Sequence, residues 1–260
     1  MAGTGKRELI MSSDAAGNNS EAFASQEDKA LAVLQAIYNA YEALSLDRQT
    51  ACEAGCSACC TGQVHLTGLE GKLINRALQQ AGRYDLIARA AEAPVSAEAM
   101  PQTTFNALAR MCIAQEEPPD KAPLDQPAGV CPLLENGLCA VYDARPMACR
   151  TMASLERCRP GGQAVEEPFW VSLNAVFFQL AEQCSLGMGG FGLLPQVMAA
   201  LLGNAEAQEG LLACEPLPGL VVPPEEQERM EEALGPVFYR LLQDRPLGVW
   251  LDELRSEAGF

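Results

Sequence analysis

Two compact groups hold eight of the eleven cysteines in this chain, and they constrain the fold more than any other feature. The first group is Cys52-x3-Cys56-x2-Cys59-Cys60, and the second is Cys131-x7-Cys139-x9-Cys149-x8-Cys158. Thiolates at short, irregular spacings are typical of metal or iron–sulfur ligation, because one segment of chain then places several sulfurs around one centre. The sequence therefore predicts that these eight cysteines are metal ligands.

Composition favours a folded protein and disfavours one class of partner. The chain has 260 residues, of which 48% are hydrophobic, so we expect one large domain or two smaller ones with a substantial core. Its 34 acidic and 18 basic residues give a formal net charge of −16. Because nucleic-acid-binding surfaces are normally basic, we expect no DNA or RNA partner. A protein partner or a protein substrate stays open.

The sequence also predicts a cytoplasmic protein. Residues 1–24 contain two basic residues but no apolar stretch, so we expect a disordered tail rather than a signal peptide. No run of about 18 apolar residues occurs, so we expect no transmembrane helix and no membrane partner. In a reducing compartment, clustered cysteines indicate metal or redox chemistry more often than disulfide bonds.

Periodicity and capping residues predict a mainly α fold with a few short strands. Ser25 followed by Asp28 resembles a capping box, and Thr67 and Glu70 have the same spacing. Both pairs precede segments with helical periodicity, and three more such segments follow. Loops and a small hairpin would then hold the metal centre. The helices are expected at about 25–46, 67–80, 84–92, 102–115 and 168–184, with an extended piece from Gln63 to Leu66 and loops at 50–62 and 116–130.

We expect three parts along the chain: the tail, a cysteine-rich zinc- or iron-chelating domain over 25–185, and a helical C-terminal segment over 186–260. The last segment should contain three helices. Gly187-x-Gly189-x-x-Gly192 matches the dinucleotide-binding fingerprint by letter, but it follows a helix and no βαβ pattern surrounds it. We therefore interpret the glycine-rich stretch Ser185–Gly192 as a hinge.

A small hairpin is predicted over residues 131–143. Asn136-Gly137 is a strong signal for a type I′ turn. A strict two-residue turn would pair Cys139 with Leu134 and point Cys131 to the opposite face. A bulge or an irregular strand at Cys131 would be needed for both thiols to bind one metal.

The first cysteine group allows two local geometries. Cys52, Cys56 and Cys59 are spaced so that a helical turn would place them on one face. Alternatively, the segment from Gly55 to Cys59 forms a metal-binding knuckle. Neighbouring side chains diverge in both helix and strand, so Cys59 and Cys60 are not expected to share one mononuclear site. Cys60 would then serve a second metal, a polynuclear cluster or a supporting position beside the centre.

Four arginines lie near the last two cysteines of the second group. A collar of positive charge there would offset the negative charge of a thiolate-rich centre. Among them, Arg145 and Arg150 are the expected cofactor-binding residues. The four are Arg145, Arg150, Arg157 and Arg159.

The remaining cysteines and the single histidine are expected to have structural positions. Cys112 and Cys184 each lie with apolar residues on a helix face, which predicts core packing. Cys214 falls in a loop, and its environment is undetermined. His65 is expected at an ordinary strand position beside the cysteine loop. No catalytic residue can be assigned from the sequence.

Together, the two halves of the cysteine pattern resemble a known family. Cys52 to Glu70 (C-x3-C-x2-CC, then Val-His-Leu-Thr-x2-Glu), with Cys131-Pro-Leu-Leu and Cys139-Ala-Val-Tyr-x3-Pro-x2-Cys149-Arg150, is similar to the CxxCxxCC family of zinc- or iron-chelating proteins. The resemblance covers about residues 50–160 and implies that these cysteines bind zinc or an iron–sulfur cluster. Flagellin lysine N-methylases have the same type of motif, which implies a link to protein modification. The family spacing is C-x2-C where this chain has C-x3-C at Cys52.

Three functions remain compatible with these observations. The first is a metal-binding protein that carries a cysteine-ligated iron–sulfur cluster, with four irons favoured, or zinc. The second is an enzyme in which the cluster supports redox chemistry or protein modification. The third is a zinc-stabilised scaffold that acts through protein contacts without catalysis.

Overall fold

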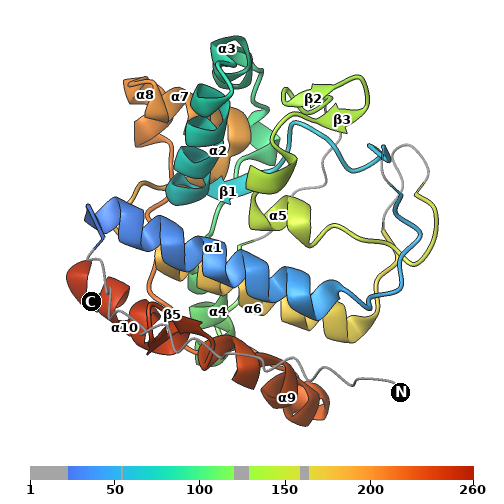
Figure 1. Cartoon of the computed structure of the whole chain (residues 1–260), viewed down its shortest axis with the longest axis vertical. Helices are drawn as coiled ribbons and strands as arrows, with labels where there is room; N and C mark the ends of the chain where they lie inside the picture. Colours follow the sequence, from blue (N-terminus) through green and yellow to red (C-terminus); the bar gives the residue numbers. More distant parts are fainter. Residues whose placement is uncertain (1–22, 54, 120–128, 159–163) are drawn as a thin grey trace, which may run out of the picture.

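Figure 1 shows the chain as a computed structural model, which describes residues 23–53, 55–119, 129–158 and 164–260. Helices dominate the described part, and its strands form three short antiparallel pairs, so the prediction of a mainly α fold with a few short strands is confirmed. Residues 1–22 of the predicted tail lie outside the described residues.

The elements occur in the following order. The α-helices are α1 (Gln26–Ser45), α2 (Gly68–Gln80), α3 (Tyr84–Glu92), α4 (Phe105–Ala114), α5 (Met147–Arg150), α6 (Pro168–Cys184), α7 (Leu194–Leu201), α8 (Ala205–Glu209), α9 (Gln227–Phe238) and α10 (Leu247–Glu257). Short 3-10 turns occur at Ala97–Ala99, Tyr142–Ala144 and Pro224–Glu226. The strand pairs are β1 (His65–Thr67) with β4 (Phe191–Leu193), β2 (Leu134–Glu135) with β3 (Leu138–Cys139), and β5 (Leu241–Leu242) with β6 (Arg245–Pro246).

Two buried clusters form most of the core. The first lies between α1 and α6, and α9 and α10 pack against it. The second lies between α2, α3 and α7. In Figure 1, α1 and α6 run side by side, with α9 and α10 on one side of the pair and α2, α3, α7 and α8 on the other. Residues from before and after position 185 contribute to both clusters.

Side-chain caps fix the starts of the first two helices, as predicted. The Ser25 hydroxyl accepts a hydrogen bond of 3.0 Å from the backbone N–H of Asp28. Thr67 and Glu70 form a complete capping box, in which the Glu70 carboxyl accepts from the Thr67 N–H at 2.8 Å. The apolar face predicted for the first helix is also buried: Leu31, Leu34, Tyr38 and Tyr41.

The glycine-rich stretch that the sequence suggested as a hinge forms a turn followed by strand β4. In the β1–β4 pair, Thr67 lies opposite Phe191. Gly189 has a φ of +125°, and a Cβ atom added to Gly68 would lie 2.7 Å from the Gly189 Cα. Two backbones approach too closely here for a side chain on either residue. These glycines therefore allow the two backbones to pack closely, and β1 is buried against β4.

We expect Gly68→Ala to lower the free energy of unfolding by about 1–3 kcal/mol. The added methyl group would overlap backbone atoms of Gly189, which cannot rotate aside as a side chain can. Gly248→Ala is the matched control, since a Cβ there meets only ordinary contacts of 3.6 Å or more. Urea denaturation of both variants measures the difference. Equal stability of the two variants would contradict the close approach.

Two of the three other cysteines are buried. Cys184 is 1% exposed, which confirms the prediction, and Cys214 is buried too. The prediction for Cys112 is wrong: its side chain is exposed, because α4 turns a different face, including Asn106, toward α6. The helix predicted from residue 102 begins only after Thr104, which caps it.

Beyond position 193 the chain has more elements than expected. Four α-helices, α7 to α10, replace the predicted three, because Asn204 caps the separate short helix α8. The β5–β6 pair, with Gln243 and Asp244 at positive φ, separates α9 from α10. Within the described ranges, no helix combines the length and apolarity needed to cross a membrane.

Candidate metal centre

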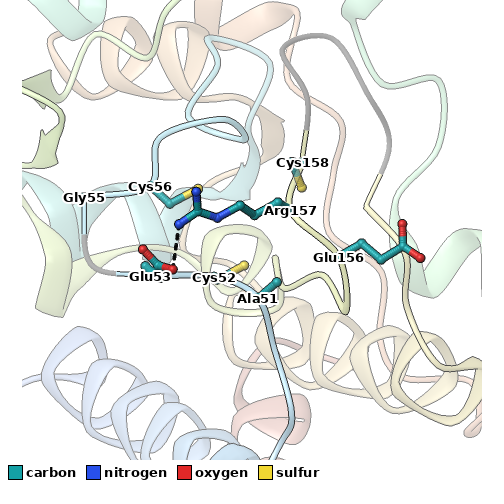
Figure 2. Close-up of a pocket in the computed structure, with 8 residues that line it drawn as sticks. All are labelled: Ala51, Cys52, Glu53, Gly55, Cys56, Glu156, Arg157 and Cys158. Carbon is teal, nitrogen blue, oxygen red and sulfur yellow. Dashed lines mark hydrogen bonds and ion pairs between the residues drawn. The ribbon is translucent and has the colours of Figure 1, made fainter.

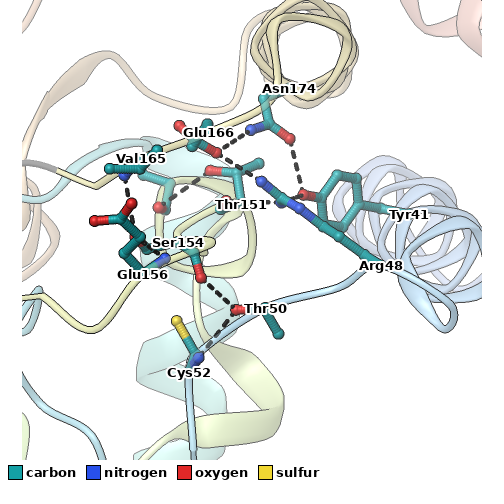
Figure 3. Close-up of polar contacts among 11 residues, drawn as sticks. Tyr41, Arg48, Thr50, Cys52, Thr151, Ser154, Glu156, Val165, Glu166 and Asn174 are labelled. Atoms are coloured by element: carbon teal, nitrogen blue, oxygen red, sulfur yellow. Dashed lines mark hydrogen bonds and ion pairs between the residues drawn. The ribbon is translucent and has the colours of Figure 1, made fainter.

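Two cysteine-bearing segments are joined at their bases, close to the end of α1. The N–H of Ala51 donates to the Ser154 carbonyl at 2.7 Å, and the Thr50 hydroxyl donates to the same carbonyl at 3.1 Å. The Thr50 hydroxyl also accepts from the Cys52 N–H at 3.0 Å. Figure 3 shows the two contacts of the Thr50 hydroxyl, with Ser154 and with Cys52. They fix the chain immediately before Cys52 against the chain that leads to Cys158.

A buried arginine extends this anchor to helices α1 and α6. Arg48 donates to the Glu166 carboxyl at 2.7 Å and to the Thr151 carbonyl at 3.3 Å, and its side chain is 7% exposed (Figure 3). The Tyr41 hydroxyl donates to the Asn174 side chain on α6 at 2.8 Å. Because the network joins α1, α6 and both loop bases, it sets where the cysteine loops leave the core.

The hairpin is held against α3 and against the first cysteine loop. Arg83 forms two hydrogen bonds of 2.8 Å with the Glu135 carboxyl, and Arg89 donates to the Pro132 carbonyl at 2.6 Å. The Cys131 N–H donates to the Cys60 carbonyl at 3.0 Å. This backbone bond brings the two cysteine groups together, although 70 residues separate Cys60 from Cys131 in the sequence.

The predicted geometry of the hairpin is largely confirmed. Leu134 pairs with Cys139, and Asn136 and Gly137 both have positive φ, as a type I′ turn requires. Cys131 precedes the hairpin in an irregular turn, in which the Leu134 N–H donates to the Cys131 carbonyl. Cys131 and Cys139 consequently lie near enough to interact electrostatically. The hairpin itself ends earlier than predicted, because Tyr142–Ala144 forms a 3-10 turn.

Helix α5, which the sequence did not predict, carries Cys149. Its first N–H, from Met147, donates to the buried Glu70 carboxyl at 2.7 Å. The same carboxyl accepts from the Tyr38 hydroxyl at 2.8 Å. Glu70 therefore links α1, α2 and α5 through one group. The position of Cys149 depends on that link.

Five cysteines lie in one neighbourhood, and we call them the inner group. A hydrogen bond from the Cys60 thiol lowers the pKa of Cys59 to about 6, and the positive charge of Arg145 adds to the effect. Burial, and then the charges of Cys131, Cys139 and Cys59, raises the pKa of Cys149 to about 12. The inner group consists of Cys59, Cys60, Cys131, Cys139 and Cys149.

The adjacent cysteines Cys59 and Cys60 of the inner group influence each other's pKa. A turn in which the Cys60 N–H donates to the Ser57 carbonyl at 3.0 Å brings the Cys59 and Cys60 thiols within hydrogen-bonding reach. The hydrogen bond makes Cys60 the donor, which lowers the pKa of Cys59 and raises that of Cys60.

The other three cysteines of the two motifs line a surface pocket, and we call them the outer group: Cys52, Cys56 and Cys158. The pocket has a volume of about 330 Å³ and is also lined by Glu53 and Arg157. In Figure 2 the Arg157 side chain extends across this pocket, with its guanidinium near Cys56. The structure thus separates the eight predicted ligands into five and three.

The two arginines expected to bind a cofactor have different surroundings. The Arg145 guanidinium lies 3.8 Å from the centre of the Tyr142 ring, and its buried Nε has no hydrogen-bond partner among the described residues. Arg150 donates to the Arg145 carbonyl at 2.9 Å, and its side chain is 2% exposed. It also pairs with Glu42. Arg145 is thus the arginine placed beside the inner group, whereas Arg150 supports the turn that carries it. Arg159 lies outside the described residues.

The cysteine thiols are suitable ligands for a soft metal, although their side chains are not arranged around one position in this structure. Every cysteine is a free thiol, and thiolates are the ligands that zinc and iron–sulfur clusters prefer. Over the described ranges, no three His, Cys, Asp or Glu side chains are gathered closely enough to hold one ion. Binding would therefore require the thiols to turn inward, as is common where metal binding and local folding are coupled.

The single histidine has the structural environment that the sequence indicated. His65 lies in β1, its ring stacks on that of Phe191 at 5.9 Å, and its Nε2 is 3.3 Å from the Ala99 carbonyl. Sequence reasoning overlooked the roles of Glu53 and Arg48. The capping-box spacing identified Glu70, but nothing in the sequence indicated its contact with α5.

Comparison of the chain with protein-family models, with curated proteins and with solved structures found no match.

Proposed function

We propose that this is a metal-binding protein whose inner group holds a cysteine-ligated iron–sulfur cluster. The observation that carries the proposal is that five free thiols from three separate segments, 59–60, 131–139 and 149, interact electrostatically with one another, with the Arg145 guanidinium beside them. Packing alone gives no reason for thiols from such distant segments to lie in one partly exposed neighbourhood. The similarity of the motif to the CxxCxxCC family supports the same proposal.

The donor set favours a cluster over a single zinc ion. A tetrahedral zinc site needs four thiolates, and the inner group offers five, two of them adjacent. Arg145 and Arg89 would offset the negative charge of a thiolate-bound cluster, since both act electrostatically on inner-group thiols. Bound there, a cluster would supply one-electron transfer in a cytoplasmic redox or protein-modifying role. The protein's own residues would anchor it and set its charge environment.

A zinc-stabilised scaffold is the second candidate, and one observation favours it. The segments that carry the inner group have little regular structure, since the hairpin strands are two residues long and α5 is four. A zinc ion bound by four of the five thiolates would hold these segments together, and its role would be structural rather than catalytic. In that case the protein would act through contacts with a protein partner.

Substitution of single cysteines tests the proposal. We expect Cys59→Ser and Cys149→Ser to lose most of the bound metal, whereas Cys112→Ser retains it, because Cys112 is an exposed thiol on α4 outside the motif segments. The measurement is iron, zinc and acid-labile sulfide per folded chain after anaerobic purification, with folding checked by circular dichroism. Full metal content in both inner-group variants would contradict the proposal.

A further inference from the structure

Three motif cysteines line a surface pocket that the proposed function leaves unused. Cys52, Cys56 and Cys158 contribute to its walls, and no cysteine of the inner group does. The pocket volume of about 330 Å³ is at the lower end of the range for small-molecule sites. Cys52 and Cys56 are exposed and Cys158 is half-buried, so dissolved small molecules can reach the three thiols.

The two segments that form the pocket are anchored at their bases. The Ala51 N–H is bonded to the Ser154 carbonyl, as described above, and the Leu155 N–H donates to the Val165 carbonyl at 2.8 Å. The Ser154 hydroxyl accepts hydrogen bonds from the N–H groups of Val165 and Glu156, at 3.0 and 3.3 Å. Because the bases are fixed, the side chains of the pocket keep their relative places, and little ordering entropy opposes the binding of a ligand.

One arginine of the pocket lies beside one of its thiols. The Arg157 guanidinium interacts electrostatically with Cys56, and Figure 2 shows it next to the Cys56 sulfur. It also forms an ion pair of 2.8 Å with Glu53, and these two side chains are 77% and 68% exposed. The positive charge, its carboxylate partner and the thiol are thus all open to solvent at one place.

The pocket combines a group that recognises carboxylates with a nucleophile. Exposed ion pairs are weak, so an external carboxylate can replace Glu53 on the Arg157 guanidinium. The planar fork of N–H donors recognises any carboxylate in the same way. An accessible cysteine, through its thiolate, attacks a sulfur atom of a disulfide. The arrangement therefore suits a reaction partner that carries both a carboxylate and a disulfide.

We propose that this pocket is a thiol–disulfide exchange site, in which Cys56 attacks a small disulfide that carries a carboxylate and Arg157 holds that carboxylate. The Cys56 Sγ forms a bond with one sulfur of the disulfide, and the original sulfur–sulfur bond breaks. The other half leaves as a thiolate and takes up a proton from water, so Cys56 is oxidised to a mixed disulfide and the leaving half is reduced. This activity needs no metal and does not rest on the function proposed for the inner group.

Two disulfides serve as probes: oxidised glutathione, which carries carboxylates, and the neutral disulfide of 2-mercaptoethanol. The full chain is incubated with each probe without air. The remaining thiols are then alkylated in acid, and mixed disulfides are located by tandem mass spectrometry. Cys112, an exposed thiol on α4, is the reference within the same chain. We expect the ratio of Cys56 to Cys112 modification to be about two- to fivefold higher with oxidised glutathione than with the neutral disulfide.

Variants of the ion pair test how the carboxylate is recognised. Arg157→Gln should remove the preference for oxidised glutathione, whereas Glu53→Gln should increase it, since the competing carboxylate is gone. A change in the reactivity of the thiol itself would affect both probes equally, so the preference reports the carboxylate alone. Arg229→Gln, which breaks a similarly exposed pair with Glu167, is the matched control and should keep the wild-type preference.

Two results would overturn this inference. If Arg157→Gln showed the same preference as the wild type, Arg157 would not hold the carboxylate. If neither probe modified Cys56 while both modified Cys112, the pocket would not be an exchange site. The metal content of the inner group is measured on the same preparations, and the exchange at Cys56 is expected whether or not metal is found there. Failure of this inference and failure of the proposed function are therefore distinguishable.

Discussion

Replacing Glu70 by alanine is expected to lower the free energy of unfolding by about 3–5 kcal/mol. The Glu70 carboxyl is 3% exposed and accepts hydrogen bonds from the Tyr38 hydroxyl, the Thr67 N–H and the Met147 N–H, at 2.7–2.8 Å. Removal of the carboxyl leaves all three buried donors without their acceptor. Each unpaired buried donor costs about 1–3 kcal/mol, and partial entry of water offsets some of that sum. Urea denaturation followed by circular dichroism measures the change.

Two further variants make this expectation specific. Glu70→Gln keeps the size of the side chain but replaces one acceptor oxygen with a donor, so a smaller loss is expected. Glu206→Ala removes an exposed glutamate from α8 and should change stability by no more than about 0.5 kcal/mol. If Glu70→Ala were as stable as Glu206→Ala, the carboxyl would not be the link between α1, α2 and α5.

The second large effect is expected on metal removal. If the inner group holds a metal centre, binding stabilises the folded chain by up to about 10 kcal/mol, because its ligands come from segments with little structure of their own. A chelator should therefore lower the thermal unfolding temperature and increase hydrogen exchange at the backbone bonds between 60–62 and 129–131. The buried cluster between α1 and α6 contains few residues from the cysteine-bearing segments. The helix content should therefore persist at low temperature after the metal is removed.

Cys112→Ser is the matched control for chelation, since it removes an exposed thiol outside the motif segments. It should respond to the chelator as the wild-type protein does, whereas Cys149→Ser should respond little because its centre is already lost. Identical unfolding curves for the wild type with and without chelator would show that no metal centre stabilises this fold.

Local signals in the sequence predicted the helices and the hairpin well. The Thr67–Glu70 box starts α2, and the helix predicted over 168–184 matches α6 residue for residue. The Asn136-Gly137 turn sets the pairing of Leu134 with Cys139. These features depend on residues within a few positions of one another, so their physics is present in the sequence itself.

Features that depend on distant contacts were missed. The pairing of β1 with β4 joins residues more than 120 positions apart, and close approaches at Gly189, Gly190 and Gly192 explain the glycine-rich stretch. Helix α5 is four residues long, too short for a periodic signal, and the buried Glu70 carboxyl fixes its first N–H. Cys112 shows the same limit, because an apolar stripe does not say which face of a helix the neighbouring helix covers.

For the candidate site, the sequence identified the eight cysteines but not their division. Spacing groups Cys52 and Cys56 with Cys59, whereas the structure places them with Cys158, at the other end of the motif. The bond between the Cys131 N–H and the Cys60 carbonyl brings the inner cysteines together. Neither contact follows from spacing alone, since both need the bases of the loops to be set by the core.

Metal and acid-labile sulfide analysis of anaerobically purified wild-type protein, with its visible spectrum, tests the central claim most directly. We expect a brown protein that contains iron and sulfide in similar amounts, with thiolate-to-iron charge-transfer absorption. Colourless protein with stoichiometric zinc and no sulfide would rule out the cluster and favour the scaffold. Protein that contains neither iron nor zinc, and takes up neither on reconstitution, would contradict a metal centre at the inner group.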